Sequence, residues 1–216
     1  MYIKTSEQEE LVLGIGSYIC NWGMHICGLY ETEKERDEII FGFLHRGIID
    51  RDKMLYCPSE RTAEDFRTKF TQNFKTNLAE LESTNRFSLS SAKALYYPDG
   101  YFEPHIMDKN LNAFYTESQK PERCNIRATA EMTWALEAIP GVEKLMIYES
   151  RLNYFIPKKP WISICLYNIS KFDGTTIMNL LKTHPFTISG GILLQNPFFI
   201  PPEQWLSVHA PQYLNP

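Results

Sequence analysis

The chain has 216 residues, with 22 Lys and Arg against 26 Asp and Glu, and a formal net charge of −4. Hydrophobic residues make up 44 % and charged residues 22 %, so collagen-like repeats, coiled coils and long disordered regions are excluded. A chain of this length buries about 70 % of its unfolded surface, so its core can be stable without disulfides or structural metal ions. One α/β domain, or two small domains, fit this length.

The charges and apolar runs also exclude some partners. Lys and Arg are scattered and the densest pair is Lys158-Lys159, so we expect no direct nucleic-acid contact. The longest apolar run, Leu11 to Cys20, is too short for a bilayer, which needs about 20 residues. The acidic stretch Met1 to Glu10 does not fit a signal peptide. Five scattered cysteines without a CxxC pair are typical of a reduced, cytoplasmic protein without membrane contacts.

The first elements follow from glycines and capping residues. Residues 1–22 are expected to form a helix broken at Gly14 and Gly16, or a flexible lead-in, so we separate a segment 1–20 from a domain 21–216. The apolar run from Met24 to Tyr30 predicts a buried strand. Thr32 and Glu35, three residues apart, form a capping-box pattern for a helix that ends at Gly47.

The same alternation of strands and helices continues to the end of the chain. We expect strands over 53–57, 86–94, 124–133 and 161–167, helices over 63–81 (capped by Ser59 or Thr62), 104–120, 142–155 and 175–181, and a terminal β-hairpin of 186–188 with 192–194. Such alternation indicates a mainly parallel sheet with helices on both faces. We therefore predict a single three-layer α/β domain, with a ligand crevice at the carboxyl ends of its strands.

Nucleotide-binding and hydrolase motifs are missing from the sequence. No Gly is followed by Lys, which a P-loop requires, and Gly14-Ile15-Gly16 lacks the third glycine of a dinucleotide fingerprint. The turn after the first strand reads Tyr30-Glu31-Thr32, where a carboxylate would repel phosphate. HExxH and GxSxG are also absent. We therefore expect neither NTP hydrolysis nor nucleophile-elbow hydrolysis.

Polar residues interrupt the apolar face of the helix 142–156. Glu149 and Asn153 lie four residues apart at core positions. A buried carboxylate needs a partner, and Arg127 or Arg151 could supply it. The pair would then be a structural tie between helix and sheet, or the polar floor of a ligand site.

Other polar and aromatic residues lie late in the predicted strands. Tyr30, Glu31, Cys57, Glu131 and Tyr167 are expected to surround one crevice at the carboxyl edge. His25 and Cys27 face the same side of their strand. His and Cys could ligate zinc or haem, but no pair has strong metal-ligand spacing, so we expect no metal or other cofactor. Trp134 and the tyrosines favour an apolar organic pocket or, alternatively, plain core packing.

Five segments resemble, in this order, the MEDS domain, the methanogen/methylotroph sensory family: Trp22–Thr32, Ile126–Trp134, Tyr148–Asn153, Ile164–Asn168 and Leu181–Pro185. The resemblance covers about residues 20–200. It implies a fold similar to RecA- or KaiC-type ATPase domains without the phosphate loop. It also implies a role in sensing small hydrocarbon derivatives or methylated compounds.

The family pattern carries over to thirteen residues, all of which except Tyr148 form our candidate ligand-binding set: His25, Cys27, Tyr30, Glu31, Arg127, Glu131, Trp134, Tyr148, Glu149, Asn153, Cys165, Tyr167 and His184.

These residues lead to one preferred function and two alternatives. We expect a stand-alone, non-enzymatic sensory domain that binds a small organic ligand. It would signal to a separate kinase or transcription regulator, and could pair as a homodimer. The first alternative is a ligand-free RecA-like interaction scaffold. The second is a thiol- or metal-based redox sensor or enzyme that uses Cys27, Cys57 or Cys165 with His25 or His184.

Overall fold

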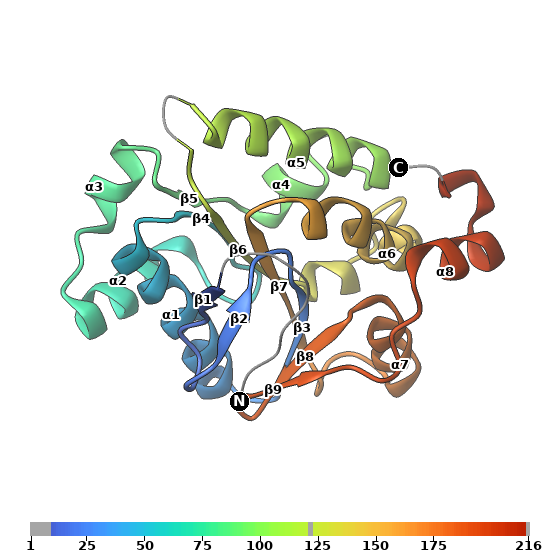
Figure 1. Ribbon diagram of the computed structural model, residues 1–216, viewed down its shortest axis with the longest axis horizontal. Helices are drawn as coiled ribbons and strands as arrows, with labels where there is room; N and C mark the ends of the chain where they lie inside the picture. Colours follow the sequence, from blue (N-terminus) through green and yellow to red (C-terminus); the bar gives the residue numbers. More distant parts are fainter. Residues whose placement is uncertain (1–9, 121–122, 215–216) are drawn as a thin grey trace.

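A seven-stranded sheet forms the middle layer of the computed structural model, which describes residues 10–120 and 123–214 (Figure 1). The strand order is β5-β4-β6-β7-β3-β8-β9, and all neighbours pair in parallel except β8 and β9. The strands are β1 (Glu10–Val12), β2 (Ile19–Asn21), β3 (His25–Tyr30), β4 (Lys53–Cys57), β5 (Phe87–Leu89), β6 (Ile126–Glu131), β7 (Trp161–Asn168), β8 (Phe186–Ser189) and β9 (Ile192–Gln195).

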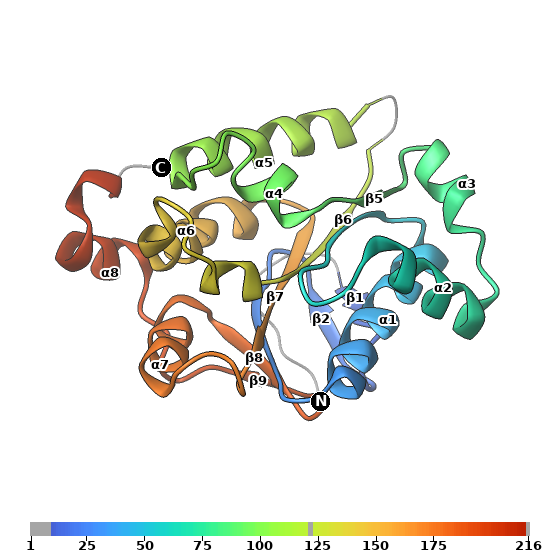
Figure 2. The same cartoon turned by 180° about the vertical axis from the view of Figure 1, so that it is seen from behind.

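Helices cover both faces of this sheet (Figures 1 and 2). The α-helices are α1 (Glu33–Asp50), α2 (Ala63–Phe74), α3 (Leu78–Ser83), α4 (Ala92–Tyr96), α5 (Pro104–Ser118), α6 (Leu145–Phe155), α7 (Gly174–Thr183) and α8 (Pro202–His209). Short 3-10 turns occupy Thr133–Leu136, Val142–Lys144, Ile156–Lys158 and Pro211–Tyr213. The predicted three-layer, mainly parallel architecture with a terminal hairpin is confirmed.

The described part of the segment before β3 is a hairpin, so a helix is the wrong prediction there. Strands β1 and β2 pair antiparallel, and Leu11, Leu13 and Ile15 are buried at alternate positions. Gly14 and Gly16 have φ of +90° and +55°, which turns the chain instead of kinking a helix. A Cβ on Gly14 would lie 2.4 Å from the carbonyl oxygen of Gly42, so this turn packs tightly on α1. Residues 1–9 lie outside the described residues.

Helix boundaries differ from the sequence predictions where left-handed residues end a helix. The capping box at Thr32 is present, but α1 continues past Gly47 and ends at Arg51, which has φ 61°. Gly47 is needed for packing, because a Cβ there would lie 2.9 Å from the side chain of Arg127. The expected helix 63–81 is two helices, since Lys75 has φ 51° and Asn77 caps α3. The expected strand 86–94 is shorter in the structure, because it contains β5 and then the start of α4 at Ala92.

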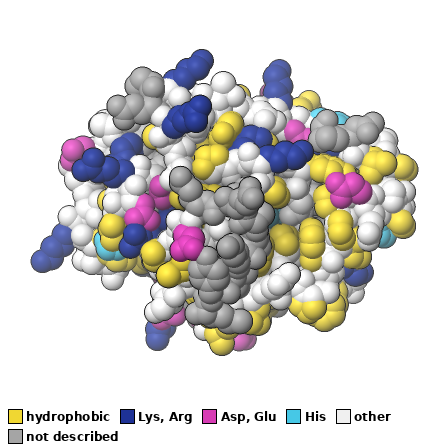
Figure 3. Space-filling view, in the orientation of Figure 1, with side chains coloured by type: hydrophobic (Ala, Val, Ile, Leu, Met, Phe, Trp, Pro, Cys, Tyr) yellow, Lys and Arg dark blue, Asp and Glu magenta, His cyan; other side chains and the backbone are white. Residues whose placement is uncertain are grey.

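The C-terminal segments after the sheet include α8, which the sequence did not predict. Several exposed large hydrophobic side chains lie from α7 to α8: Met178 in α7, Ile192 and Leu194 in β9, Phe198 after β9, and Val208 in α8. Figure 3 has the orientation of Figure 1. It shows hydrophobic side chains gathered on the surface where α7 and α8 lie in Figure 1. No helix within residues 10–120 and 123–214 is long and apolar enough to cross a membrane.

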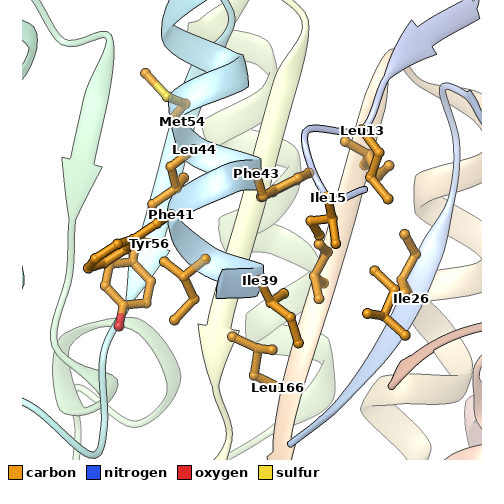
Figure 4. Close-up of a cluster of buried hydrophobic side chains, with 14 of the residues drawn as sticks. Leu13, Ile15, Ile26, Ile39, Phe41, Phe43, Leu44, Met54, Tyr56 and Leu166 are labelled. Carbon is orange, nitrogen blue, oxygen red and sulfur yellow. The ribbon is translucent and has the colours of Figure 1, made fainter. Parts of the chain in front are cut away.

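The two faces of the sheet have separate apolar cores. Helices α1 and α2 pack on one face, where Ile39, Phe43 and Leu44 of α1 belong to one buried apolar cluster with Ile26 and Leu166 of the sheet (Figure 4). Helices α4 to α7 pack on the other face, against odd-numbered residues of β3 and β7 and even-numbered residues of β6. Strand alternation therefore decides to which core each candidate residue belongs.

Candidate functional site

The sheet divides the expected crevice into two polar clusters on opposite faces. His25 and Cys27 of β3 face α6, whereas Tyr30, an odd number of positions further on, belongs to the α1 core. On β6, Glu131 likewise faces α1, opposite to Ala128 and Ala130. The structure therefore does not bring Tyr30, Glu31, Cys57, Glu131 and Tyr167 around one crevice.

The cluster on the α1 face is centred on the buried carboxylate of Glu131. Its oxygens accept hydrogen bonds from the Tyr56 hydroxyl (2.6 Å) and from the backbone N–H groups of Ser59 (2.8 Å) and Glu60 (2.5 Å). The Nε atoms of Arg36 and Arg61 lie 3.4 and 3.5 Å from Oε1. Two guanidinium groups and three donors thus compensate this carboxylate in place.

Tyr30 and Glu31 belong to the surroundings of this first cluster. The Tyr30 hydroxyl donates to Glu60 Oε1 at 2.8 Å. The N–H groups of Glu31 and Thr32 donate to Glu35 Oε2 at 2.8 and 3.0 Å. These amides open α1 after β3, where a P-loop protein would bind phosphate. A carboxylate of the chain already caps them, in agreement with the missing phosphate-loop motif.

The cluster on the α6 face is centred on Glu149. Its Oε2 lies 3.1 Å from His25 Nε2 and 3.3 Å from His184 Nε2, and its Oε1 accepts from the Tyr167 hydroxyl at 2.5 Å. Cys165 Sγ lies 3.5 Å from His25 Nε2. The side chains of His25, Glu149 and His184 have no solvent exposure. The structure thus joins five of the predicted residues, drawn from β3, α6, β7 and the end of α7.

Asn153 completes the α6-face cluster one turn after Glu149. Its Oδ1 lies 3.2 Å from His25 Nδ1, and its Nδ2 donates to the carbonyl of Thr183 at 2.8 Å. The predicted pairing of Glu149 and Asn153 on one helix face is therefore seen in the structure. It connects α6 to β3 and to the end of α7.

Burial controls the protonation of the α6-face cluster. It lowers the pKa of His25 to about 4, with a further contribution from the neighbouring His184, against the opposing effect of Glu149. Burial works to raise the pKa of Glu149, but His184 and His25 hold it below its usual range. Burial and the charge of Glu149 raise the pKa of Cys165 well above that of an ordinary thiol. Near neutral pH the cluster therefore contains a carboxylate, a neutral His25 and a protonated thiol.

Neither arginine proposed as a partner of Glu149 contacts it. Arg127 begins β6 at the amino end of the sheet, where its Nε lies 2.7 Å from Asp52 Oδ2 and its Nη1 donates to the carbonyl of Leu13. Arg151 pairs with Asp108 at 2.6 Å. Arg151 is two residues after Glu149 on α6, and side chains at this spacing point in different directions. Arg127 is an odd-numbered residue of β6, whose even-numbered residues face α6. Arg127 ties the β1–β2 hairpin to the sheet, away from the carboxyl edge.

Trp134 lies in the core rather than in an open pocket. Its ring is fully buried and stacks on Tyr96, with centroids 4.5 Å apart. Tyr96 in turn lines a small apolar cavity of about 20 Å³ between β6, β7 and α6. Cys165 is the one member of the candidate set in its wall. The remaining lining residues are Leu55, Leu95, Tyr96, Leu111, Ala128, Thr129, Ala130, Tyr148, Leu152, Phe155, Ile156, Trp161 and Ser163.

Sequence reasoning missed several residues that these sites require. The Glu131 cluster also contains Tyr56, Glu60, Arg36 and Arg61. Of these, only Arg36 could have been recognised in the sequence, because it lies on the apolar face of the predicted helix. The cavity residues carry no polar signature, so only the docking of α4, α5 and α6 on the sheet reveals them.

The mainly parallel sheet with helices on both faces defines the class of fold, an α/β domain similar to KaiC-like proteins. The structure superimposes on a KaiC-like protein from Pyrococcus horikoshii OT3 with a TM-score of 0.60 at 12 % identity, covering 84 % of this chain and 80 % of that chain. It superimposes on the flagellar accessory protein FlaH from Methanocaldococcus jannaschii with a TM-score of 0.52 at 16 % identity, covering 83 % and 78 %. At these identities the likeness concerns the fold alone.

Sequence comparison then gives the family. The model of MEDS, the methanogen/methylotroph, DcmR sensory domain, matches residues 24–185. The chain therefore belongs to the MEDS family, which indicates a sensory role. The matched residues include both polar clusters and all residues that line the cavity. No curated protein matches the chain.

Proposed function

We propose that the protein is a non-enzymatic sensory domain that binds a small organic molecule in the cavity beneath α6 and signals to a separate partner protein. The cavity carries this proposal, because it is apolar, lies between a helix and the sheet, and has a few polar groups in its wall. A sensory family supplies the context for such a site.

The size and lining of the cavity define the class of ligand. A volume of about 20 Å³ exceeds the roughly 10–15 Å³ that one water requires, so the cavity suits a molecule of one or two carbons. Leu152, Phe155 and Trp161 offer apolar contacts. The lining residues that carry polar groups are Cys165, Ser163, Thr129, Tyr96 and Tyr148. A small hydrocarbon derivative or methylated compound fits this lining.

Signalling would pass through α6, which forms one wall of the cavity. This helix also packs on α5, α7 and α8. A ligand that favours one position of α6 on the sheet increases the population of that conformation. The exposed C-terminal segments that contact α6 would then change position with it. The apolar side chains of Ile192, Leu194 and Phe198 are the surface that we propose for a kinase or transcription-regulator partner, or for a second copy of the chain.

A thermal-shift screen tests the ligand proposal. Methylated amines, thiols, alcohols and halomethanes are tested against wild type, Ala128→Val and Ala92→Val. Ala128 lines the cavity, so valine fills it, whereas Ala92 is buried to a similar degree (8 % against 6 % exposed) outside it. A ligand should raise the Tm of wild type and Ala92→Val but not of Ala128→Val. Equal shifts in all three, or none in wild type, would contradict the proposal.

The ligand-free scaffold remains the competing function, and the capped start of α1 supports it equally well. Affinity capture of a partner from the native host, with and without a compound from the screen, distinguishes the two. Partner binding that ignores every compound favours the scaffold.

All five cysteines are thiols in the structure, which supports our placement of the protein in the cytoplasm.

A further inference from the structure

Four potential metal ligands converge on the α6 face of the sheet. One ligand atom each from His25, Glu149, Cys165 and His184 lies within 4.8 Å of the other three. All four residues are buried. They come from β3, α6, β7 and the residue after α7, so the folded domain holds them in place.

Both imidazoles are fixed through their Nδ1 atoms. His184 Nδ1 lies 2.8 Å from the carbonyl oxygen of Leu180, which can only accept, so this nitrogen carries the hydrogen. The Asn153 amide nitrogen donates to backbone carbonyls, and its oxygen therefore faces His25 Nδ1 at 3.2 Å and accepts from it. Such outer hydrogen bonds to the second ring nitrogen orient metal-binding histidines.

This arrangement leaves the centre of the cluster short of hydrogen-bond donors. With the ring hydrogen on Nδ1, the Nε2 lone pairs of His25 and His184 face Glu149 Oε2 at 3.1 and 3.3 Å. The Tyr167 hydroxyl is directed to the other oxygen of Glu149. One weak S–H donor, Cys165, remains for three acceptors, and His184 Nε2 has no hydrogen-bond partner among the described residues. A cation between these atoms would satisfy all of them.

We propose that His25, Glu149, Cys165 and His184 form a binding site for a divalent transition metal ion, with Zn²⁺ as the best fit. Two nitrogens, one carboxylate oxygen and one thiolate are ligands that zinc accepts, whereas calcium and magnesium take oxygen ligands. Tetrahedral bonds of about 2.0–2.3 Å separate ligand atoms by roughly 3.3–3.8 Å. Three of the separations are 3.1, 3.3 and 3.5 Å, and the other pairs lie within 4.8 Å, so some of the ligand atoms must move closer together to hold the ion.

Two properties of Cys165 affect this metal site. It binds as a thiolate, so uptake of the ion releases its proton. It also lines the apolar cavity, which places the ion beside that space. The site departs from the sequence-based expectation of no metal, and it does not depend on the small-molecule proposal.

Metal stoichiometry and cobalt spectroscopy of the full chain test the site. The protein is stripped with a chelator and titrated with Zn²⁺ against a chromophoric competitor, and X-ray absorption defines the ligands of the bound zinc. We expect one zinc per chain with one sulfur and three nitrogen or oxygen neighbours. Co²⁺ in its place should give tetrahedral visible bands and a thiolate-to-cobalt charge-transfer band.

Two cysteine variants make the assignment specific. Cys165→Ser should lose the charge-transfer band and at least tenfold in zinc affinity. Cys57→Ser, a matched change at a buried thiol of the same core, should alter neither. Absence of stoichiometric metal in wild type would overturn the proposal in favour of a protonated histidine network. A zinc site without sulfur, or a charge-transfer band that survives Cys165→Ser, would also overturn it. The wild-type measurements decide even if Cys165→Ser does not fold.

Discussion

The two faces of the sheet each bury one glutamate, and they compensate its charge in different ways. Glu131 is surrounded by two guanidinium groups, a tyrosine and backbone N–H groups. Glu149 also has a tyrosine, but its other neighbours are two imidazoles and a thiol. The Glu131 cluster contains its own permanent cations, Arg36 and Arg61, although several of their buried nitrogens make no hydrogen bond among the described residues. The Glu149 cluster contains no permanent cation among the described residues, so on our proposal it takes up a metal ion in compensation.

The largest expected effect comes from removing each carboxylate charge in turn. Glu131→Gln removes the fully buried carboxylate that Arg36 and Arg61 share, and leaves them the partly exposed Asp37 as a common counter-charge. It should cost about 3–5 kcal/mol in the free energy of unfolding. Glu149→Gln in metal-free protein should change it by less than about 1 kcal/mol, since the amide can donate to the imidazole nitrogens. Urea denaturation of both variants measures the difference. Equal losses would mean that the histidines are already charged, and the contrast between the faces would fail.

Much of this fold could be predicted because its signals are local. Apolar runs gave β3, β4 and β7, and the Thr32 capping pair placed the start of α1. The hairpin before β3 could not be predicted in the same way, since its two glycines read equally well as helix breakers. Its position depends on contact with α1 and Arg127, far away in sequence.

The candidate site was predictable in membership but not in arrangement. Strand parity alone places Tyr30 opposite to His25, and Glu131 opposite to Ala128 and Ala130. The meeting of His25, Glu149 and His184 requires the strand order and the docking of α6. No spacing rule supplies these, because His25 lies 124 positions before Glu149 and further still before His184.

An intermediate effect is expected from a matched pair of tyrosine variants. Tyr56 donates to Glu131 at 2.6 Å and Tyr167 donates to Glu149 at 2.5 Å, one on each face. Tyr56→Phe and Tyr167→Phe should each cost about 1.5–3 kcal/mol, because each removes a hydrogen bond to a charged group. Zinc affinity should fall about tenfold in Tyr167→Phe, which frees the carboxylate to turn, and should not change in Tyr56→Phe. An equal change in both would assign the loss to general destabilisation.

The smallest effect is expected from thiol labelling of the native protein. It tests whether the buried cysteines on the α6 face are reactive enough for a thiol-based redox sensor. Cys27, Cys57 and Cys165 lie buried on that face, and Cys20 on the other, where burial raises its pKa to about 11. A shift from 9.0 to about 11 reduces the thiolate fraction roughly hundredfold at neutral pH. Mass spectrometry after brief alkylation should therefore find label at the half-exposed Cys124 and little at the four buried positions. Rapid modification of Cys165 or Cys27 would contradict this result and support a thiol-based sensor. Protection of both, with or without zinc, would argue against the thiol-based redox sensor.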